Sequence, residues 1–196
     1  IFNSTNEDFD TWNKYITCMI HYPSLAMAEA VCGISHPTAF LWRHKIFATV
    51  NDYQDHQKLK GRVWIDETYV DDSTILHEFG KKRKRGLSRD KKCIVVAIDQ
   101  HKNMVSIVCG NGKPSSKRIK QALENHIEPG STIVHDGERA HSGLIKKLKC
   151  NEELYKANTN DSVYLQAMQL VNNLCGWLKR YLYKFMGLKM KNLQLY

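Results

Sequence analysis

The sequence lacks the features that would assign it to a membrane, to the secretory route or to a structural zinc site. No apolar run approaches the roughly 20 residues that a membrane-spanning helix needs, and residues 1–8 have neither the basic start nor the apolar stretch of a signal peptide. None of the six cysteines belongs to a Cys-x-x-Cys pair, which favours reduced core thiols of a cytoplasmic protein. An initiating Met is also absent, and we expect the chain to be a fragment.

Positive charge is scarce in the first third of the chain and abundant in the rest. Residues 1–60 hold 5 Lys and Arg against 6 Asp and Glu, whereas residues 61–196 hold 24 against 14. A polyanionic partner is therefore expected to bind mainly the second part. With 196 residues, of which 42% are hydrophobic, the chain can form one domain with a sizeable core and a small appendage.

Residues 1–50 predict helices in a helix-turn-helix arrangement. Ser24 can cap a helix that ends at Gly33, and Ser35 can cap the next one. If the second of these helices reads a DNA groove, its polar side chains would make the contacts: His36, Arg43, His44 and Lys45. Because the segment has no net positive charge, a helical hairpin that packs on the main domain is the alternative. The polar residues 51–61 are expected to form a linker.

The remaining residues, 62–196, predict a mixed α/β domain. Residues 62–69 alternate as a strand, which places Asp66 and Glu67 on opposite faces. Two more strands at 93–100 and 103–109 would complete an antiparallel meander, and a strand at 131–136 follows a helix at 115–127. After such a helical crossover the last strand can return parallel beside the first. This order predicts a ribonuclease H-like sheet flanked by helices, with a long helix from about 162 to 186 closing the chain.

Two acids and an amide lie where this topology would bring them together. Asp66 is on the first strand, Asp136 ends the neighbouring strand, and Asn172 is on the closing helix. Two Mg²⁺ or Mn²⁺ ions held by such oxygen ligands can stabilise the attacking and leaving oxygens of phosphodiester chemistry. Lys179 follows Asn172 by seven residues, on nearly the same helical face, and could hold a phosphate. Singly, each acid could be a turn former, and Asn172 or Lys179 a solvated side chain.

Four sequence blocks together resemble bacterial insertion-sequence transposases of the ISXO type. They are Trp64-Ile-Asp-Glu-Thr-Tyr69, the basic run ending at Gly86, the block from His135 to His141, and the block from Val171 to Arg180. The resemblance covers roughly residues 10–196. This group belongs to the DDE superfamily, and in it Asn commonly replaces the third acid and is followed by a Lys. Glu67 matches a recurrent family residue, although its opposite-face position argues against metal ligation.

The resemblance implies a DNA transposase that cleaves at the ends of an insertion element and joins them to target DNA. It implies that Asp66, Asp136, Asn172 and Lys179 are catalytic and that the first three hold metal. The expected DNA contacts are basic side chains: Lys81, Lys82, Arg83, Lys84, Arg85, Arg43, Lys45 and Arg180. The partner would be double-stranded DNA, bound by a homo-oligomer in the bacterial cytoplasm.

Two other functions fit the same residues. The chain could be a decayed transposase that binds DNA without cutting it, or a ribonuclease H-like nuclease or resolvase. In the family a zinc ribbon usually precedes these segments, and the sequence contains none. Residues 62–196 are accordingly expected to be a C-terminally truncated catalytic domain of a longer protein.

Overall fold

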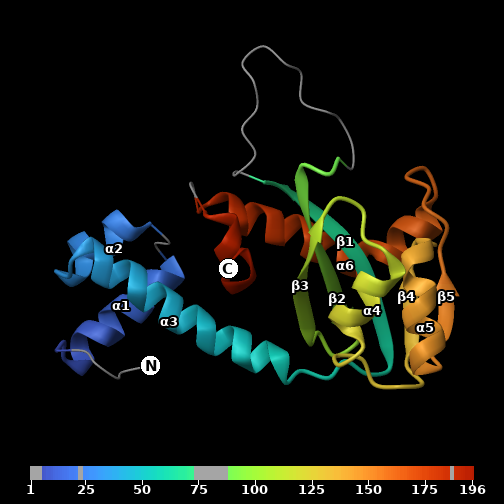
Figure 1. The fold of residues 1–196 in the computed structure, drawn as a ribbon, viewed down its shortest axis with the longest axis horizontal. Coiled ribbons are helices and arrows are strands. Elements are labelled where there is room, and N and C mark those ends of the chain that lie inside the picture. The colour runs from blue at the N-terminus through green and yellow to red at the C-terminus, as the bar shows by residue number, and fades with distance from the viewer. Residues whose placement is uncertain (1–5, 22–23, 73–87, 186–187) are drawn as a thin grey trace, which may run out of the picture.

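The computed structural model describes residues 6–21, 24–72, 88–185 and 188–196. Three helices come first, α1 (Phe9–His21), α2 (Leu25–Cys32) and α3 (His36–Asp55), and α3 leads from this helical group to the sheet (Figure 1). Among the described residues, no helix is both long and apolar enough to cross a membrane. The basic residues Lys81–Arg85 lie outside the described part.

The three N-terminal helices enclose a small core of their own. Trp12 of α1 stacks on Trp42 of α3 with ring centroids 3.6 Å apart, and Ala28 of α2 is buried beside them. Two of the predicted helix ends are confirmed, since Gly33 closes α2 in the left-handed conformation and the Ser35 hydroxyl accepts a hydrogen bond from the backbone N–H of Thr38. Ser24 occupies the N-cap position of α2, but its side chain makes no capping hydrogen bond.

Helix α3 extends further than the sequence pattern predicted. It continues to Asp55, so the first half of the expected linker 51–61 is helical. The reason is local, because residues 38–55 contain neither Gly nor Pro to stop the helix.

The sheet confirms the predicted ribonuclease H-like order. Strands β1 (Arg62–Asp71), β2 (Lys91–Asp99) and β3 (Met104–Asn111) form an antiparallel meander, and β4 (Thr132–His135) pairs parallel to β1. A short strand, β5 (Asn151–Leu154), adds parallel to β4 and completes the order β3-β2-β1-β4-β5. The return of β4 beside β1 follows the helical crossover through α4 (Ser116–Leu123).

Helices cover both faces of the sheet (Figure 1). On one face lie α4, the short 3₁₀ helix η1 (Arg139–His141) and α5 (Ser142–Leu148); on the other lie α6 (Ser162–Tyr183) and the 3₁₀ helix η2 (Met190–Leu195). The alternation of β1 is confirmed, because Val63 and Ile65 pack toward α4 and α5 whereas Trp64 packs toward α6. The Trp64 indole donates a hydrogen bond to the carbonyl of Ala167, 2.8 Å away, which fixes α6 against β1.

Candidate active site

Asp66 lies in the middle of β1 on the face that α6 covers. Its carboxylate accepts a 2.8 Å hydrogen bond from the backbone N–H of Glu67. The pKa of Asp66 is raised from its ordinary 3.8 to about 6, chiefly by burial and also by the charges of Glu67 and Asp136, while the Glu67 N–H and His141 oppose the shift. Ionisation of Asp66 in the metal-free protein therefore costs free energy.

Asp136 immediately follows β4, beside the middle of β1. The backbone N–H of Glu138 donates to its Oδ1 at 3.0 Å, a local turn that holds the carboxylate at the strand end. Glu138 itself pairs with Lys113 at 2.7 Å. The structure thus brings Asp66 and Asp136 close enough to interact electrostatically, as predicted from the parallel return of β4.

Asn172 lies on α6, the helix that covers the face of these two acids. Burial raises the pKa of the Tyr164 phenol, the charges of Asp136 and Asp66 raise it further, and Asn172 lowers it. Tyr164, on the same helix, is therefore within electrostatic range of both carboxylates. Asn172 itself is exposed, so its amide is open to solvent.

Lys179 lies two turns further along α6. Burial and, less strongly, the charge of Asp66 raise the pKa of the Cys175 thiol to about 12, against the opposing charge of Lys179. Lys179 also lines a hollow with Tyr69, Val70 and Asp71, toward the end of β1. Lys179 and the following Arg180 are both exposed. The two acids and the helix that carries Asn172 and Lys179 thus lie on one face of the sheet.

A sequence profile described as an ISXO2-like transposase domain matches residues 58–196, which is most of the chain. The chain belongs to this family. No protein with curated annotation matches it. The matched segment begins just before β1 and therefore contains Asp66, Asp136, Asn172 and Lys179.

The transposase domain also resembles solved structures of the Mos1 transposase, with low similarity. A Mos1 strand transfer complex is 12% identical, with a TM-score of 0.34 over 93% of this chain and 72% of that chain. A Mos1 paired-end complex with the left transposon end is 12% identical, with a TM-score of 0.36 over 100% and 76%. A pre-cleavage Mos1 transpososome is 9% identical, with a TM-score of 0.33 over 86% and 70%.

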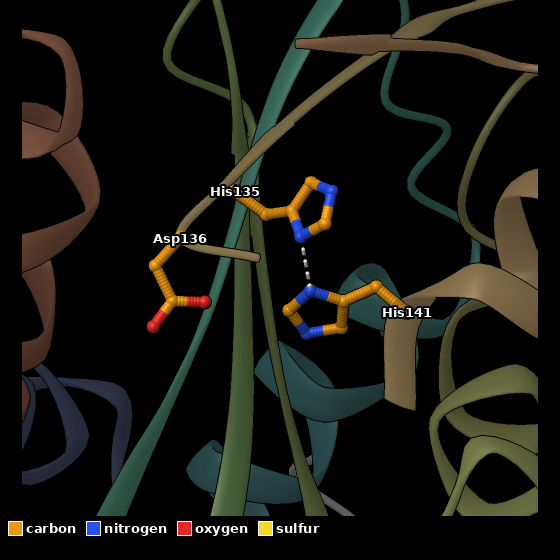
Figure 2. A group of neighbouring side chains, drawn as sticks. All are labelled: His135, Asp136 and His141. Carbon is orange, nitrogen blue, oxygen red and sulfur yellow. Dashed lines mark hydrogen bonds between the residues drawn. The ribbon is translucent and has the colours of Figure 1, made fainter. Parts of the chain in front are cut away.

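The opposite face of the transposase domain carries a second polar group. Glu67 of β1, His135 of β4 and His141 of η1 are directed away from the α6 side, and Figure 2 shows that the Asp136 carboxylate and the His135 ring diverge from adjacent positions. The Glu67 carboxylate lies 2.8 Å from His141 Nε2, on the face away from α6. The prediction that Glu67 faces away from the Asp66 site agrees with this placement.

Ligand-capable atoms of His135, Asp136 and His141 all lie within 4.8 Å of one another. His141 is completely buried and hydrogen-bonded at both ring nitrogens. Its spacing from Asp136 carried no signal of this, because the turn through Gly137 decides where the side chain points.

The N-terminal candidates for DNA contact differ in their placement. Arg43 is buried, with its guanidinium 5.2 Å from the ring centroid of Phe185 and hydrogen-bonded to Tyr15, so the structure does not present it to DNA as predicted. The reason is tertiary, since α3 packs against α1 and the C-terminal region on that side. Lys45 is partly exposed on the same helix.

Proposed function

We propose that this chain is a metal-dependent DNA transposase that cleaves at insertion-element ends and transfers the freed strand end to target DNA. What supports the proposal is the proximity of Asp66 and Asp136 on the face that α6 covers, with Asn172 and Lys179 on that helix, in a chain of a transposase family. The three oxygen-bearing side chains come from β1, from the end of β4 and from α6, and their order along the chain matches their proposed roles.

The residues present fit divalent metal ions. Burial, and after it the charges of the neighbouring Glu67 and Asp136 carboxylates, raise the pKa of Asp66. A hard dication favours carboxylate and amide oxygens, and its charge would remove the repulsion between the two acids. Asp66, Asp136 and Asn172 would hold Mg²⁺ or Mn²⁺, two ions in all, which when bound stabilise the developing charge on the attacking and leaving oxygens.

Each side chain has a distinct task in this proposal. Asp66 and Asp136 supply negative charge from rigid sheet positions. Asn172 supplies a neutral oxygen, so the site has one negative charge fewer than three acids would give, and metal binding should depend more on the phosphate oxygens of the DNA. Lys179 offers a point charge that can hold a phosphate beside the carboxylates.

Double-stranded DNA is the proposed partner, bound by a homo-oligomer that pairs two element ends. The excess of Lys and Arg over residues 61–196 supports a polyanionic partner. Exposed Arg180 extends the positive charge of Lys179 along α6, and Lys45 is a further candidate. Lys81–Arg85 remain proposed phosphate contacts. Arg43 is no longer part of this set because it is buried.

The test uses duplex DNA that carries the inverted repeats flanking the gene. Asp66→Ala and Asp136→Ala should each abolish Mg²⁺-dependent nicking while DNA binding in a gel-shift assay stays largely intact. Glu128→Ala is the matched control, because this exposed acid lies before β4, at the end remote from the site. Undiminished nicking by either aspartate variant would contradict the proposal. Binding without any cleavage by the wild type would support a DNA-binding regulator, and cleavage of branched DNA without joining would support a resolvase.

A further inference from the structure

The proposed chemistry does not use a buried network of polar side chains on the sheet face opposite the two acids. Glu67 Oε1 lies 2.8 Å from His141 Nε2, the Nδ1 atoms of His141 and His135 lie 3.1 Å apart, and His135 Nε2 lies 3.0 Å from Glu152 Oε1 (Figure 2 shows the histidine pair). The side chains of His141 and Glu67 are only 0% and 8% exposed. Polar groups this deeply buried are retained where their bonds are complete.

The donors and acceptors of this network can be assigned when both ring nitrogens of His141 carry a proton, so that His141 forms an ion pair with Glu67. A carboxylate only accepts, so His141 Nε2–H donates to Glu67 and His135 Nε2–H donates to Glu152. The backbone N–H of Gly137 points at His135 Nδ1 from 3.3 Å, so this nitrogen is an acceptor. His141 Nδ1–H then completes the chain by donating to His135. Each of these ring nitrogens has a hydrogen-bond partner. The hydrogen-bonded network therefore runs without a break from β1 to β4 and β5.

The position of this hydrogen-bonded network along the strands indicates its structural role. Over the described residues, the parallel pairing of β1 with β4 runs from Arg62–Thr132 to Trp64–Val134. Asp66 and Asp136 both lie two residues beyond the last pair. The link from Glu67 through His141 to His135 joins the sequence neighbours of these two acids, beyond the last backbone pair between β1 and β4.

We infer that Glu67, His141 and His135 form a positioning network that holds Asp66 and Asp136 in place from the far side of the sheet. The inference rests on the proposed metal-binding role of the two aspartates. In a strand, neighbouring side chains point to opposite faces, so fixing Glu67 and His135 restrains the backbone from which Asp66 and Asp136 project. The network touches neither DNA nor the reacting atoms in this arrangement, and it acts through the two aspartates.

A metal ion held by the histidine pair is the competing explanation for the same geometry. Two facing nitrogens backed by carboxylates are typical of metal-binding histidines. Here, however, the backbone N–H of Gly137 already donates a hydrogen bond to His135 Nδ1, and the Asp136 carboxylate accepts one from the backbone N–H of Glu138. A hydrogen-bonded network accounts for both of these contacts, and a metal ion between the rings accounts for neither.

The experiment measures Mn²⁺ binding to the full chain on its terminal-repeat duplex, by isothermal titration calorimetry, together with the urea midpoint. The informative variant is Glu67→Leu with His141→Phe, which removes both partners and keeps their volume, so no buried charge is left unpaired. We expect Mn²⁺ to bind 10- to 100-fold more weakly, the range seen when the support of a metal ligand is lost, with a urea midpoint close to that of the wild type. His141→Gln, whose amide can restore only one of the two hydrogen bonds of the imidazole, should bind Mn²⁺ several-fold more weakly than the wild type and more tightly than the double variant.

Arg62→Ala is the control, because it removes a 2.6 Å ion pair to Glu153 at the remote end of β1 and should leave Mn²⁺ binding unchanged. A folded double variant with wild-type Mn²⁺ affinity would overturn the inference. If that variant does not fold, unchanged affinity in His141→Gln overturns it and several-fold weaker binding supports it.

Asp66→Ala separates the inference from the function on which it rests. Unchanged Mn²⁺ binding in Asp66→Ala would refute the proposed metal site itself. If Asp66→Ala loses Mn²⁺ binding but the network variants bind Mn²⁺ as the wild type does, the positioning role alone is refuted. Binding that survives Asp66→Ala but is lost with His141→Gln would assign the ion to the histidine pair and overturn the network.

Discussion

Replacement of Asp66 by Asn should stabilise the metal-free protein at neutral pH while it removes activity. Asn keeps the size of the side chain and the oxygen that accepts from the Glu67 N–H, and it removes only the charge. The pKa of Asp66 rises from 3.8 to about 6, chiefly because of burial. A shift of about 2 units corresponds to about 3 kcal/mol, since each unit is worth about 1.4 kcal/mol.

The sign follows from which state holds the proton more tightly. A carboxyl group whose pKa is higher in the folded protein favours folding when it is protonated. This contribution is fully present below the unfolded pKa of 3.8 and is lost as the pH rises through about 6. At pH 7.5 the charged Asp66 therefore destabilises the metal-free protein, and Asn should recover about 1–3 kcal/mol, or roughly 2–4 °C in Tm for each kcal/mol in a chain of this size.

The assay is urea unfolding in EDTA at pH 7.5 and again at pH 4, with Glu128→Gln as the exposed control. The stabilisation by Asp66→Asn should be clear at pH 7.5 and nearly absent at pH 4, whereas the control should show neither effect. Added Mn²⁺ with DNA should stabilise the wild type more than the variant, because a ligand stabilises the state that binds it. A destabilised variant at pH 7.5, or an equal gain at both pH values, would refute the electrostatic reasoning.

Three further predictions concern α6 and its contacts. Asn172→Asp adds a negative charge to the proposed site of Asp66 and Asp136. In calorimetry without DNA, this variant should bind Mn²⁺ more tightly than the wild type, and it should retain some cleavage of DNA. Complete loss of cleavage in a folded variant would mean that the amide does more than ligate. Lys179→Ala should lower the slope of log affinity for DNA against log salt by about 1 relative to Lys179→Arg, and an unchanged slope would exclude a phosphate contact. Trp64→Phe loses the hydrogen bond to Ala167 and should reduce the free energy of unfolding by about 1 kcal/mol in urea, and no loss would show that this bond does not hold α6 in place.

Much of the site could be predicted because its signals are local. The period-two alternation of β1 separates Asp66 from Glu67 without any knowledge of the partners of the strand. Three consecutive strands and a helical crossover leave few topologies, and these bring β4 beside β1. The seven-residue step on α6 places Lys179 near the face of Asn172 in any straight helix.

Other features could not be predicted, because they depend on contacts between segments that are far apart in the sequence. Arg43 occupies a polar position on α3 that looks available to DNA, yet the packing of α3 against α1 and the C-terminal region buries it under Phe185. The burial of His141 depends on a turn at Gly137 and on the approach of η1 to Glu67, 74 residues away in the sequence. Tyr164 reads as an apolar helix residue until the sheet brings two carboxylates to it.

The sequence by itself determined the strands, the helices and which face of each carries the acids, since backbone periodicity needs only neighbouring residues. Only the tertiary structure decided that the two acids lie close together on the face that α6 covers, and that a buried network of histidines and carboxylates lies on the opposite face. The physical reason is that charge crowding and burial are properties of groups brought together from distant segments. Those two properties raise the pKa of Asp66 and make its neighbourhood a place for a cation.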